Sequence, residues 1–315
     1  MANQEEFGDQ IIKNLQNRDI DRVKKLLNHI DGPHLLTGDE KILIATASSD
    51  LGVIRNGGRS GSRFAPMAII NCLKKFSLNQ LQHQVALLEV GHFPSLDFEG
   101  AQSEQTGQIC SILKSPHLDC FFHLGGGHDH IYSLLKSLDQ KNKRLIVVNI
   151  DAHLDTRTDN INHSGTPFRQ FAKHCQSDFF LLQVGIHPFA NSESSFESLD
   201  PHSMQVLNFE MILKETDYFR KSIISSIEKR LGTLSELDQI ILSLDCDALE
   251  AQMMEGVSAV NGLGLDSMVV KEIFDWYQKK VKRKIIGIYE YNPLFDNLSQ
   301  KGAKFISSLI YPFLT

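Results

Sequence analysis

Short apolar segments alternate with stretches of helical periodicity along most of this 315-residue chain. The apolar segments are rich in β-branched or aromatic residues and lie at residues 42–47, 85–90, 119–124, 144–150, 178–185, 239–244 and 284–290, with a weaker one at 204–208. Helical patterns occupy residues 66–76, 100–114, 129–139, 215–231, 266–281 and 297–311. Near-continuous apolar strands joined by helices are typical of a parallel sheet covered on both faces. The chain is therefore predicted to be an α/β protein.

The number of apolar segments leaves two architectures open. About eight strands suit a closed TIM barrel as well as an open sheet, and both place ligands at the carboxyl ends of the strands. Because the chain contains no internal repeat, low-complexity stretch or Pro/Gly-rich linker, we expect a single domain over residues 1–315. Residues 1–40 are predicted to form a helical extension. A helical stripe within residues 9–28 contains Ile12, Leu15, Val23, Leu26 and Leu27.

The net charge and the cysteine content indicate which ligands and which cellular compartment to expect. The chain has 32 Lys and Arg against 38 Asp and Glu, a formal net charge of −6, which is unfavourable for binding nucleic acid or an anionic membrane. No apolar run approaches the roughly 20 residues that span a bilayer, and the polar, acidic N-terminal segment does not resemble a secretory signal. The five cysteines are scattered and lack CxxC spacing, which indicates free thiols in a reducing compartment. We therefore expect a cytoplasmic protein that acts on a small molecule.

Acidic and imidazole side chains follow three of the apolar segments directly. They are His128 in FFHLGGGHDH, Asp151, His153 and Asp155 in LIVVNIDAHLD, and Asp245 and Asp247 in IILSLDCDALE. Residues i, i+2 and i+4 of an extended backbone point to one side, so each set can converge on one site. Taken alone, each motif has an ordinary alternative, since glycine turns often follow strands and a strand-end Asp often caps a helix. All three together at strand ends predict one site.

Four carboxylates gathered in one buried site would repel one another and raise one another's pKa. Two divalent cations would neutralise them, and the two histidines would complete six ligands. An oxygen-rich set with two imidazoles and no thiolate favours manganese, with cobalt, nickel or iron as substitutes, over structural zinc or calcium. Two such ions lower the pKa of a shared water and provide hydroxide at neutral pH. The sequence therefore predicts two Mn²⁺ ions and hydrolysis at an electrophilic carbon.

At these residues the chain resembles the ureohydrolase family, which contains arginases, agmatinases and formimidoylglutamases. The resemblance extends from about residue 50 to residue 311. It implies a three-layer α/β/α fold with an eight-stranded parallel sheet, in place of a barrel, and a dinuclear manganese centre. It also implies particular roles for the six ligands. His128, His153, Asp155 and Asp245 match terminal positions, Asp151 and Asp247 match bridging positions, and Asp155 is implied to orient the bridging hydroxide as a catalytic residue.

Residues outside the metal motifs most resemble the formimidoylglutamase branch of the family. The supporting segments are DLGVIRNGGRSGSRFAP at residues 50–66, SGTPFRQ at 164–170, and GIYEYNPLFDN at 287–297. Arginases and agmatinases have an HGxP-type segment where this chain has Ser164, and an Asp-Pro after the Asp pair that this chain lacks. The implied reaction converts N-formimidoyl-L-glutamate and water to L-glutamate and formamide, a late step of histidine breakdown. The alternative is release of urea from agmatine, arginine or a guanidino acid.

A substrate with two carboxylates requires cationic or amide donors. Guanidinium groups bind carboxylates through paired hydrogen bonds. The predicted substrate contacts are Arg55, Asn56 and Arg59 in the RNGGR loop and Ser164 and Thr166 in SGTPF, with Arg157 and Arg169 as weaker candidates. For Arg55 a structural salt bridge is the alternative.

His163 is predicted to carry a proton to the leaving amine, because imidazole titrates near neutral pH. The alternative is a solvated loop histidine.

Several other polar residues are predicted to have supporting roles. His123 lies within an apolar segment and is expected in the core, whereas His130 is expected behind the ligands or on the surface. Glu290 and Asn292 are expected to support loops. Cys246 lies between two ligands, so its side chain should point away from them into the core.

The family resemblance also implies a homo-oligomer, either a trimer or a hexamer. A catalytically silent family member is a further alternative, although the chain retains all six metal-ligand positions.

Overall fold

One parallel β-sheet organises the computed structural model, which describes residues 22–29, 41–77, 84–91, 97–215 and 223–314. The strands are β1 (Leu27–His29), β2 (Ile42–Ala47), β3 (Val85–Glu89), β4 (Cys120–Gly125), β5 (Arg144–Ile150), β6 (Asp178–Ile186), β7 (Met204–Asn208), β8 (Gln239–Asp245) and β9 (Lys284–Tyr289). Their order in the sheet is β1-β3-β2-β4-β9-β8-β5-β6-β7, and every neighbouring pair is parallel. The sheet is open, with β1 and β7 at its edges, so the barrel alternative is excluded.

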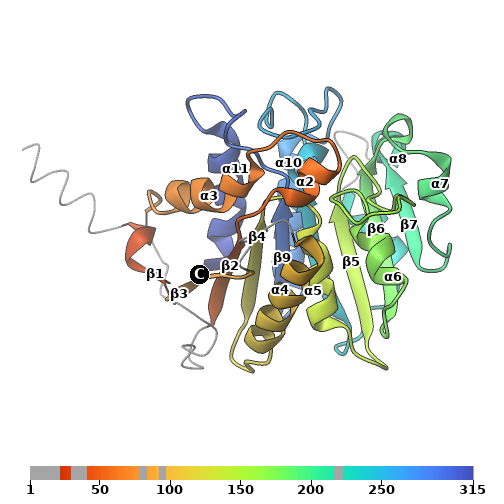
Figure 1. The fold of residues 1–315 in the computed structure, drawn as a ribbon, viewed down its shortest axis with the longest axis horizontal. Helices are drawn as coiled ribbons and strands as arrows, with labels where there is room; N and C mark the ends of the chain where they lie inside the picture. Colours follow the sequence, from red (N-terminus) through yellow and green to blue (C-terminus); the bar gives the residue numbers. More distant parts are fainter. Residues whose placement is uncertain (1–21, 30–40, 78–83, 92–96, 216–222, 315) are drawn as a thin grey trace, which may run out of the picture.

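Helices cover both faces of this sheet (Figure 1). They are α2 (Leu51–Arg55), α3 (Ala65–Leu73), α4 (Phe98–Leu113), α5 (His130–Leu138), α6 (Pro167–Ala172), α7 (Glu193–Phe196), α8 (Phe209–Glu215), α9 (Ile223–Leu231), α10 (Ser267–Lys280) and α11 (Lys301–Ile310). Helices α4, α5 and α6 share one apolar cluster with the sheet, and α3, α9, α10 and α11 share another. The predicted three-layer architecture is confirmed.

Strand β5 shows why its sequence reads as a continuous apolar run. Leu145 and Val147 point into one apolar cluster, while Ile146 and Val148 point into the other. A strand covered on both faces has no solvent side on which polar residues would alternate. The same double burial explains why β2, β4 and β8 were predicted close to their observed ends.

Within the described residues the sheet has nine strands rather than the predicted eight. The additional strand is β1, whose three residues pair with Val85–Leu87 of β3. The prediction placed residues 9–28 in a helix. Residues 1–21 lie outside the described residues, but residues 23–25 form a 3₁₀ turn and Leu27 begins a strand. A short edge strand has one pairing partner and little buried surface, so Leu27–Asn28–His29 lacks an apolar signature.

The predicted helix ranges agree less closely with the structure than the predicted strand ranges do. Helices α5, α10 and α11 fall within the predicted ranges, and α3 and α4 begin one and two residues before theirs. Asp266 caps α10 by accepting a hydrogen bond from the Met268 N–H at 2.7 Å. The prediction for 215–231 runs through residues that the structure does not describe and meets α9 at its C-terminal end. Helices α2, α6 and α7 have four to six residues, too few to show a period.

The strand order separates β4 from β5 by two strands that come later in the chain, β9 and β8. The chain therefore leaves the carboxyl ends of these central strands in different directions. Ligands of open α/β sheets bind where the strand order reverses in this way. All three predicted metal motifs follow β4, β5 and β8. In the described parts of the chain, no helix is both long enough and apolar enough to cross a membrane.

Candidate metal centre

A glycine loop carries His128 from the end of β4 to the start of α5. The backbone of this loop passes so close to its neighbours that a Cβ on Gly126 would lie 1.9 Å from the Ser49 carbonyl oxygen. A Cβ on Gly127 would lie 2.3 Å from Oδ1 of Asp129. The backbone contact requires glycine at position 126, and a side chain at position 127 would displace the Asp129 carboxyl group. The loop is thereby held against the segment that follows β2, with the His128 side chain fully buried beneath it.

The six predicted ligands lie together in two groups. His128, Asp151, Asp155 and Asp245 form the first, and Asp151, His153 and Asp247 form the second. In the first group, His128 Nδ1 lies 2.8 Å from Asp155 Oδ2 and 3.1 Å from an oxygen of each of Asp151 and Asp245. In the second, His153 Nδ1 lies 3.0 Å from Asp247 Oδ2.

Asp151 belongs to both groups through different oxygens. Its Oδ2 faces His128 at 3.1 Å, and its Oδ1 faces His153 at 3.8 Å. A carboxylate placed in this way can bridge two cations, as the resemblance implied for this residue. Asp247 was also implied to bridge, but it lies in the second group only. The 3₁₀ turn η5 (Cys246–Ala248) replaces the extended backbone that the prediction assumed, and it turns Asp247 toward His153.

The backbone after β5 also departs from the extended form. The strand ends at Ile150, and Asp155 has a φ of 52° in the left-handed region. The three side chains of DAHLD therefore converge through a bend rather than by strand alternation. Glu290, directly after β9, likewise has a positive φ of 63°. Non-glycine residues adopt this conformation at a cost, and such strain gathers at functional sites.

The electrostatics of the buried groups indicate a place for cations. Burial, and then the Asp155 carboxylate, raise the pKa of Asp151 to about 7, and burial together with Asp247 raises that of Asp245 well above its ordinary value. The Asp247 carboxylate, above all, raises the pKa of His153 to about 11. Asp247 Oδ1 is buried without a hydrogen-bond partner, and His128 Nδ1 faces three carboxylate oxygens at once. These ligand atoms, among clustered carboxylates, fit divalent metal ions.

Side chains behind the ligands fix their orientation. His128 Nε2 lies 3.0 Å from Ser243 Oγ, which leaves Nδ1 for the carboxylates. The Asn149 amide donates to Asp151 Oδ2 at 3.1 Å, and its own position is set by Gln183 Oε1 at 2.8 Å. Partners of this kind hold metal ligands in place and strengthen metal binding. Cys246 is fully buried in the apolar core, as predicted.

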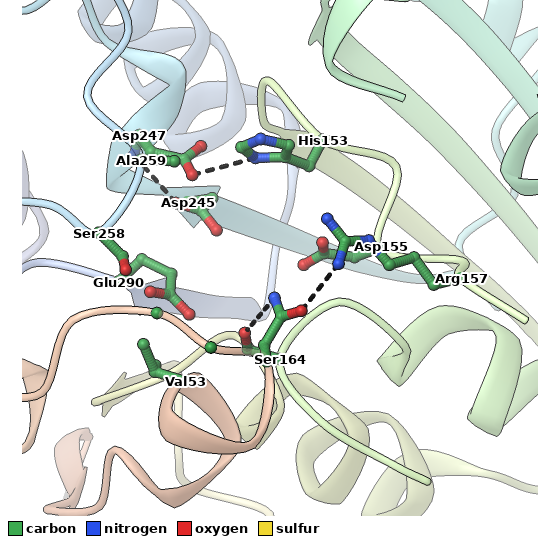
Figure 2. Close-up of a pocket in the computed structure, with 13 residues that line it drawn as sticks. Val53, His153, Asp155, Arg157, Ser164, Asp245, Asp247, Ser258, Ala259 and Glu290 are labelled. Carbon is green, nitrogen blue, oxygen red and sulfur yellow. Dashed lines mark hydrogen bonds and ion pairs between the residues drawn. The ribbon is translucent and has the colours of Figure 1, made fainter. Parts of the chain in front are cut away.

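A pocket of about 250 Å³ opens beside the ligands (Figure 2). Its lining includes carboxylates of both groups, namely Asp155, Asp245 and Asp247. From the predicted substrate residues it includes Asn56 and Ser164, and it also includes Arg157, Ser258 and Glu290. Arg157, a weaker candidate in the sequence, is the arginine among these lining residues.

Arg157, Asn56 and Ser164 are joined by hydrogen bonds at the pocket wall. The Arg157 guanidinium donates to Asn56 Oδ1 at 2.8 Å, and Asn56 Nδ2 donates to Ser164 Oγ at 3.2 Å (dashed lines in Figure 2). The Ser164 N–H in turn donates to the Gly52 carbonyl at 3.1 Å. The guanidinium is thereby tethered at the pocket wall.

The structure places the Arg55 and Arg59 side chains away from the pocket lining. The Arg55 guanidinium pairs with Glu99 at 3.0 Å and stacks over the Phe98 ring, so the structural salt bridge left open by the sequence is the observed arrangement. The Arg59 guanidinium donates to the Val257 carbonyl and stacks over Phe295. The Arg59 N–H donates to Ser258 Oγ at 2.7 Å. Both arginines therefore support the pocket walls instead of facing its interior.

His163 and Thr166 form a supporting turn rather than part of the lining. His163 Nε2 lies 2.8 Å from Asp159 Oδ2, and its Nδ1 accepts the Gly165 N–H at 3.0 Å. The Thr166 hydroxyl accepts the His163 N–H at 3.0 Å. Both ring nitrogens of His163 are thus engaged outside the pocket, in conflict with the predicted proton shuttle.

Glu290 is the functional candidate that sequence reasoning underestimated. Its Oε1 accepts the His128 N–H at 3.0 Å, as expected of a supporting residue, but the side chain also lines the pocket. Burial raises its pKa to about 8, with further contributions from neighbouring carboxylates. It directly follows β9, so the strand-end rule that found the metal ligands would also have found Glu290. Asn292 supports the loop at Arg59 and Ser60, as predicted.

Comparisons with known proteins found a matching family model and similar relatives. Residues 40–315 match the model of the Arginase family. Formimidoylglutamase from Cupriavidus pinatubonensis is 29% identical over 307 residues, covering 94% of this chain and 93% of the relative. Formimidoylglutamase from Hahella chejuensis is 32% identical over 259 residues, covering 78% and 76%.

Solved structures share the fold. The formimidoylglutamase of Bacillus subtilis superposes with a TM-score of 0.78 at 22% identity, covering 93% of this chain and 90% of that one. Trypanosoma cruzi formiminoglutamase, whose crystal structure contains Mn²⁺, superposes with a TM-score of 0.73 at 22% identity, covering 88% and 93%.

Proposed function

Because the chain belongs to the arginase family, we propose that it is a manganese-dependent hydrolase that converts N-formimidoyl-L-glutamate and water to L-glutamate and formamide. The observation that carries this proposal is the position of Asp151, whose two oxygens face two separate groups of ligands beside a pocket with one arginine. The names of its relatives, at up to 32% identity, support the substrate.

The six ligands found in the sequence would hold the two ions. His128, Asp155 and Asp245 would bind one, His153 and Asp247 the other, and Asp151 both. When bound, two manganese ions neutralise the carboxylates and supply a hydroxide nucleophile at neutral pH. The mixture of carboxylates and imidazoles without thiolate fits manganese.

Asp155 and Glu290 face the pocket in positions suited to the reacting amidine. We assign to Glu290 the hydrogen bonds from the N–H groups of the amidine, because its carboxylate is a lining acceptor outside both ligand groups. Asp155 would orient the attacking hydroxide and pass its proton to the departing amine nitrogen. This assignment replaces His163, whose ring nitrogens are bound to Asp159 and Gly165.

Arg157 is assigned to a substrate carboxylate, with Asn56 and Ser164 beside it. Replacing Arg157 by methionine is expected to raise KM roughly 10- to 100-fold, because a hydrogen bond to a charged group contributes about 1.5–3 kcal/mol. The effect on kcat should be smaller, because this contact is made before and during the reaction alike. Steady-state kinetics measure both constants. Arg55→Met is the matched control, and an equal rise in its KM would contradict the assignment.

Glu290→Gln is expected to lower kcat/KM by roughly 10- to 100-fold, because the neutral amide removes one charge-assisted partner of the amidine. Its side chain can still accept the His128 N–H through the amide oxygen, so the ligand loop should keep its position. Manganese content by atomic emission separates the two roles. If the variant loses manganese together with activity, Glu290 acts on the metal centre and not on the substrate.

The assay that tests the function compares N-formimidoyl-L-glutamate with agmatine, arginine and guanidinobutyrate in the presence of manganese, scoring formamide and urea separately. Formamide from the first substrate alone is the expected result. Urea from a guanidino substrate without formamide would overturn the substrate assignment and leave the metal centre in place.

The cellular compartment, the pathway, the domain organisation and the oligomeric state of the enzyme are also part of the proposal. All five cysteines are free thiols, which suits a reducing compartment, and we place the enzyme in the cytoplasm. The substrate assigns it to histidine degradation. We propose one domain over residues 1–315, since a single sheet runs through the described residues. A homo-oligomer, trimeric or hexameric, is implied by the family and would be measured by sedimentation.

A further inference from the structure

A chain of buried polar side chains connects helix α4 with the ring that stacks on His128. Gln105 of α4 lies at its centre, with Nε2 3.0 Å from His123 Nε2 and Oε1 3.1 Å from His130 Nδ1. His123 Nδ1 lies 2.9 Å from the Tyr289 hydroxyl. All four residues are at most 1% exposed. An amphipathic helix normally packs apolar side chains on a sheet, so a glutamine at this position requires an explanation.

The Tyr289 ring packs against one face of the His128 imidazole. Their ring centroids lie 5.1 Å apart at an interplanar angle of 26°, a stacked arrangement. Phe168 meets the same imidazole edge-on at 5.5 Å, and Ser243 Oγ lies 3.0 Å from its Nε2. These three neighbours contact His128 in the orientation that points Nδ1 toward Asp151, Asp155 and Asp245.

Two strand glycines provide the space for the Tyr289 ring. A Cβ on Gly125 of β4 would lie 2.6 Å from Tyr289 Cδ1, and a Cβ on Gly287 of β9 would lie 2.4 Å from its hydroxyl. Glycine weakens the interior of a strand. The fold accepts this cost at two neighbouring strands, and the ring of Tyr289 occupies the space that results. The two glycines therefore determine the position of the ring in the sheet, and the contact with His123 fixes its hydroxyl group.

The same glutamine also reaches the glycine loop. His130, bound to Gln105, has its Nε2 3.1 Å from the Ser49 carbonyl oxygen. That oxygen also accepts the Gly127 N–H, directly before His128, at 3.3 Å. Gln105 is thus connected to His128 by two routes. One runs through His123 and the Tyr289 ring, and the other runs through His130, the Ser49 carbonyl and the loop backbone.

We propose that Gln105 is a positioning residue for the manganese ion of the first ligand group, acting on His128 through His123 and Tyr289. The inference rests on the proposed metal centre. Its alternative is a network that only satisfies buried polar groups, and such a network would contribute to folding without distinguishing one ion from the other. The two ligand groups provide the distinction, because His128 belongs to the first and not to the second.

Gln105→Leu tests the proposal, since leucine fills similar space and offers no hydrogen bond. Manganese binding is measured by titration calorimetry in two backgrounds, His153→Ala, which retains the first ligand group, and His128→Ala, which removes its histidine. We expect Gln105→Leu to weaken binding roughly 10- to 100-fold in the first background, the usual effect of losing a partner behind a metal ligand. In the second background it should leave the affinity unchanged.

Gln102→Leu is the matched control, because Gln102 is a second buried glutamine of α4 whose amide binds the Asp129 carbonyl and whose oxygen accepts from Gln170. Equal losses in both backgrounds, no loss in the first, or the same loss from Gln102→Leu would each overturn the proposal. Tyr289→Phe, which keeps the ring and removes its bond to His123, is the second variant should Gln105→Leu fail to fold, and the same criteria apply. Wild-type protein that binds no manganese would refute the proposed function itself.

Discussion

Asp151→Asn is expected to abolish hydrolysis and to reduce manganese content at both positions. Asp151 is the ligand that the two groups share, with Oδ2 toward His128 and Oδ1 toward His153. An amide can offer one oxygen but cannot bridge two cations with two oxygens, and it removes one of the four negative charges that balance them. We expect kcat to fall by at least about 10³-fold, in the range seen when a group essential to catalysis is lost.

Metal analysis and kinetics together check this prediction. The matched control is Asp129→Asn, a substitution of the same chemistry at a buried aspartate next to His128 that belongs to neither group. Burial raises the pKa of Asp129, and its Oδ1 has no hydrogen-bond partner, so a neutral amide should be tolerated there. A fully active Asp151→Asn variant, or one that keeps two ions, would contradict the shared-ligand geometry.

Removing the metal is expected to abolish activity and to reverse the pH dependence of stability. In the metal-free protein, burial and neighbouring carboxylates raise the pKa of Asp151 to about 7 and that of Asp245 well above its ordinary value. The carboxylate partners likewise outweigh burial and raise the pKa of His128. Groups whose folded pKa exceeds the unfolded value stabilise the fold at low pH, and this stability is lost as pH rises through the folded pKa.

The metal-loaded protein should behave in the opposite way. Metal ligands bind in their deprotonated forms, so the affinity for manganese increases with pH. Thermal unfolding at about pH 6 and about pH 8, with manganese or with chelator, measures both slopes. Two ions bound well above their Kd should raise the melting temperature at the higher pH by roughly 10–20 °C. Parallel slopes with and without metal would mean that these carboxylates do not hold the ions.

The strands and the ligand motifs could be predicted because their signals are local. Strands such as β5 are buried on both faces, and residues at or shortly after the carboxyl ends of β4, β5 and β8 reach one edge of the sheet. His128, Asp151 and Asp245 were therefore found from sequence spacing. The three-residue strand β1 carries no comparable signal, because its pairing with β3 depends on a distant segment.

The substrate side of the pocket was harder to predict, because loop side chains are oriented by partners far along the chain. Arg55 lies in a suggestive loop but turns to Glu99, 44 residues away, and Arg59 turns to Val257. Arg157 faces the pocket because Asn56, 101 residues away, holds its guanidinium. The role of Asp247 depended similarly on the turn η5, which the extended-strand assumption could not foresee.

The gathering of carboxylates at this sheet edge has a consequence for measured kinetics. Without its ions, the pocket lacks the divalent charge that would attract a dianionic substrate, and Arg157 is the arginine in its lining. Metal-free copies should therefore neither turn over substrate nor sequester it. Partial metal loading should then lower the number of active molecules without changing KM. In a partly loaded preparation, the rate of turnover at saturating substrate therefore measures the fraction of molecules that hold their ions.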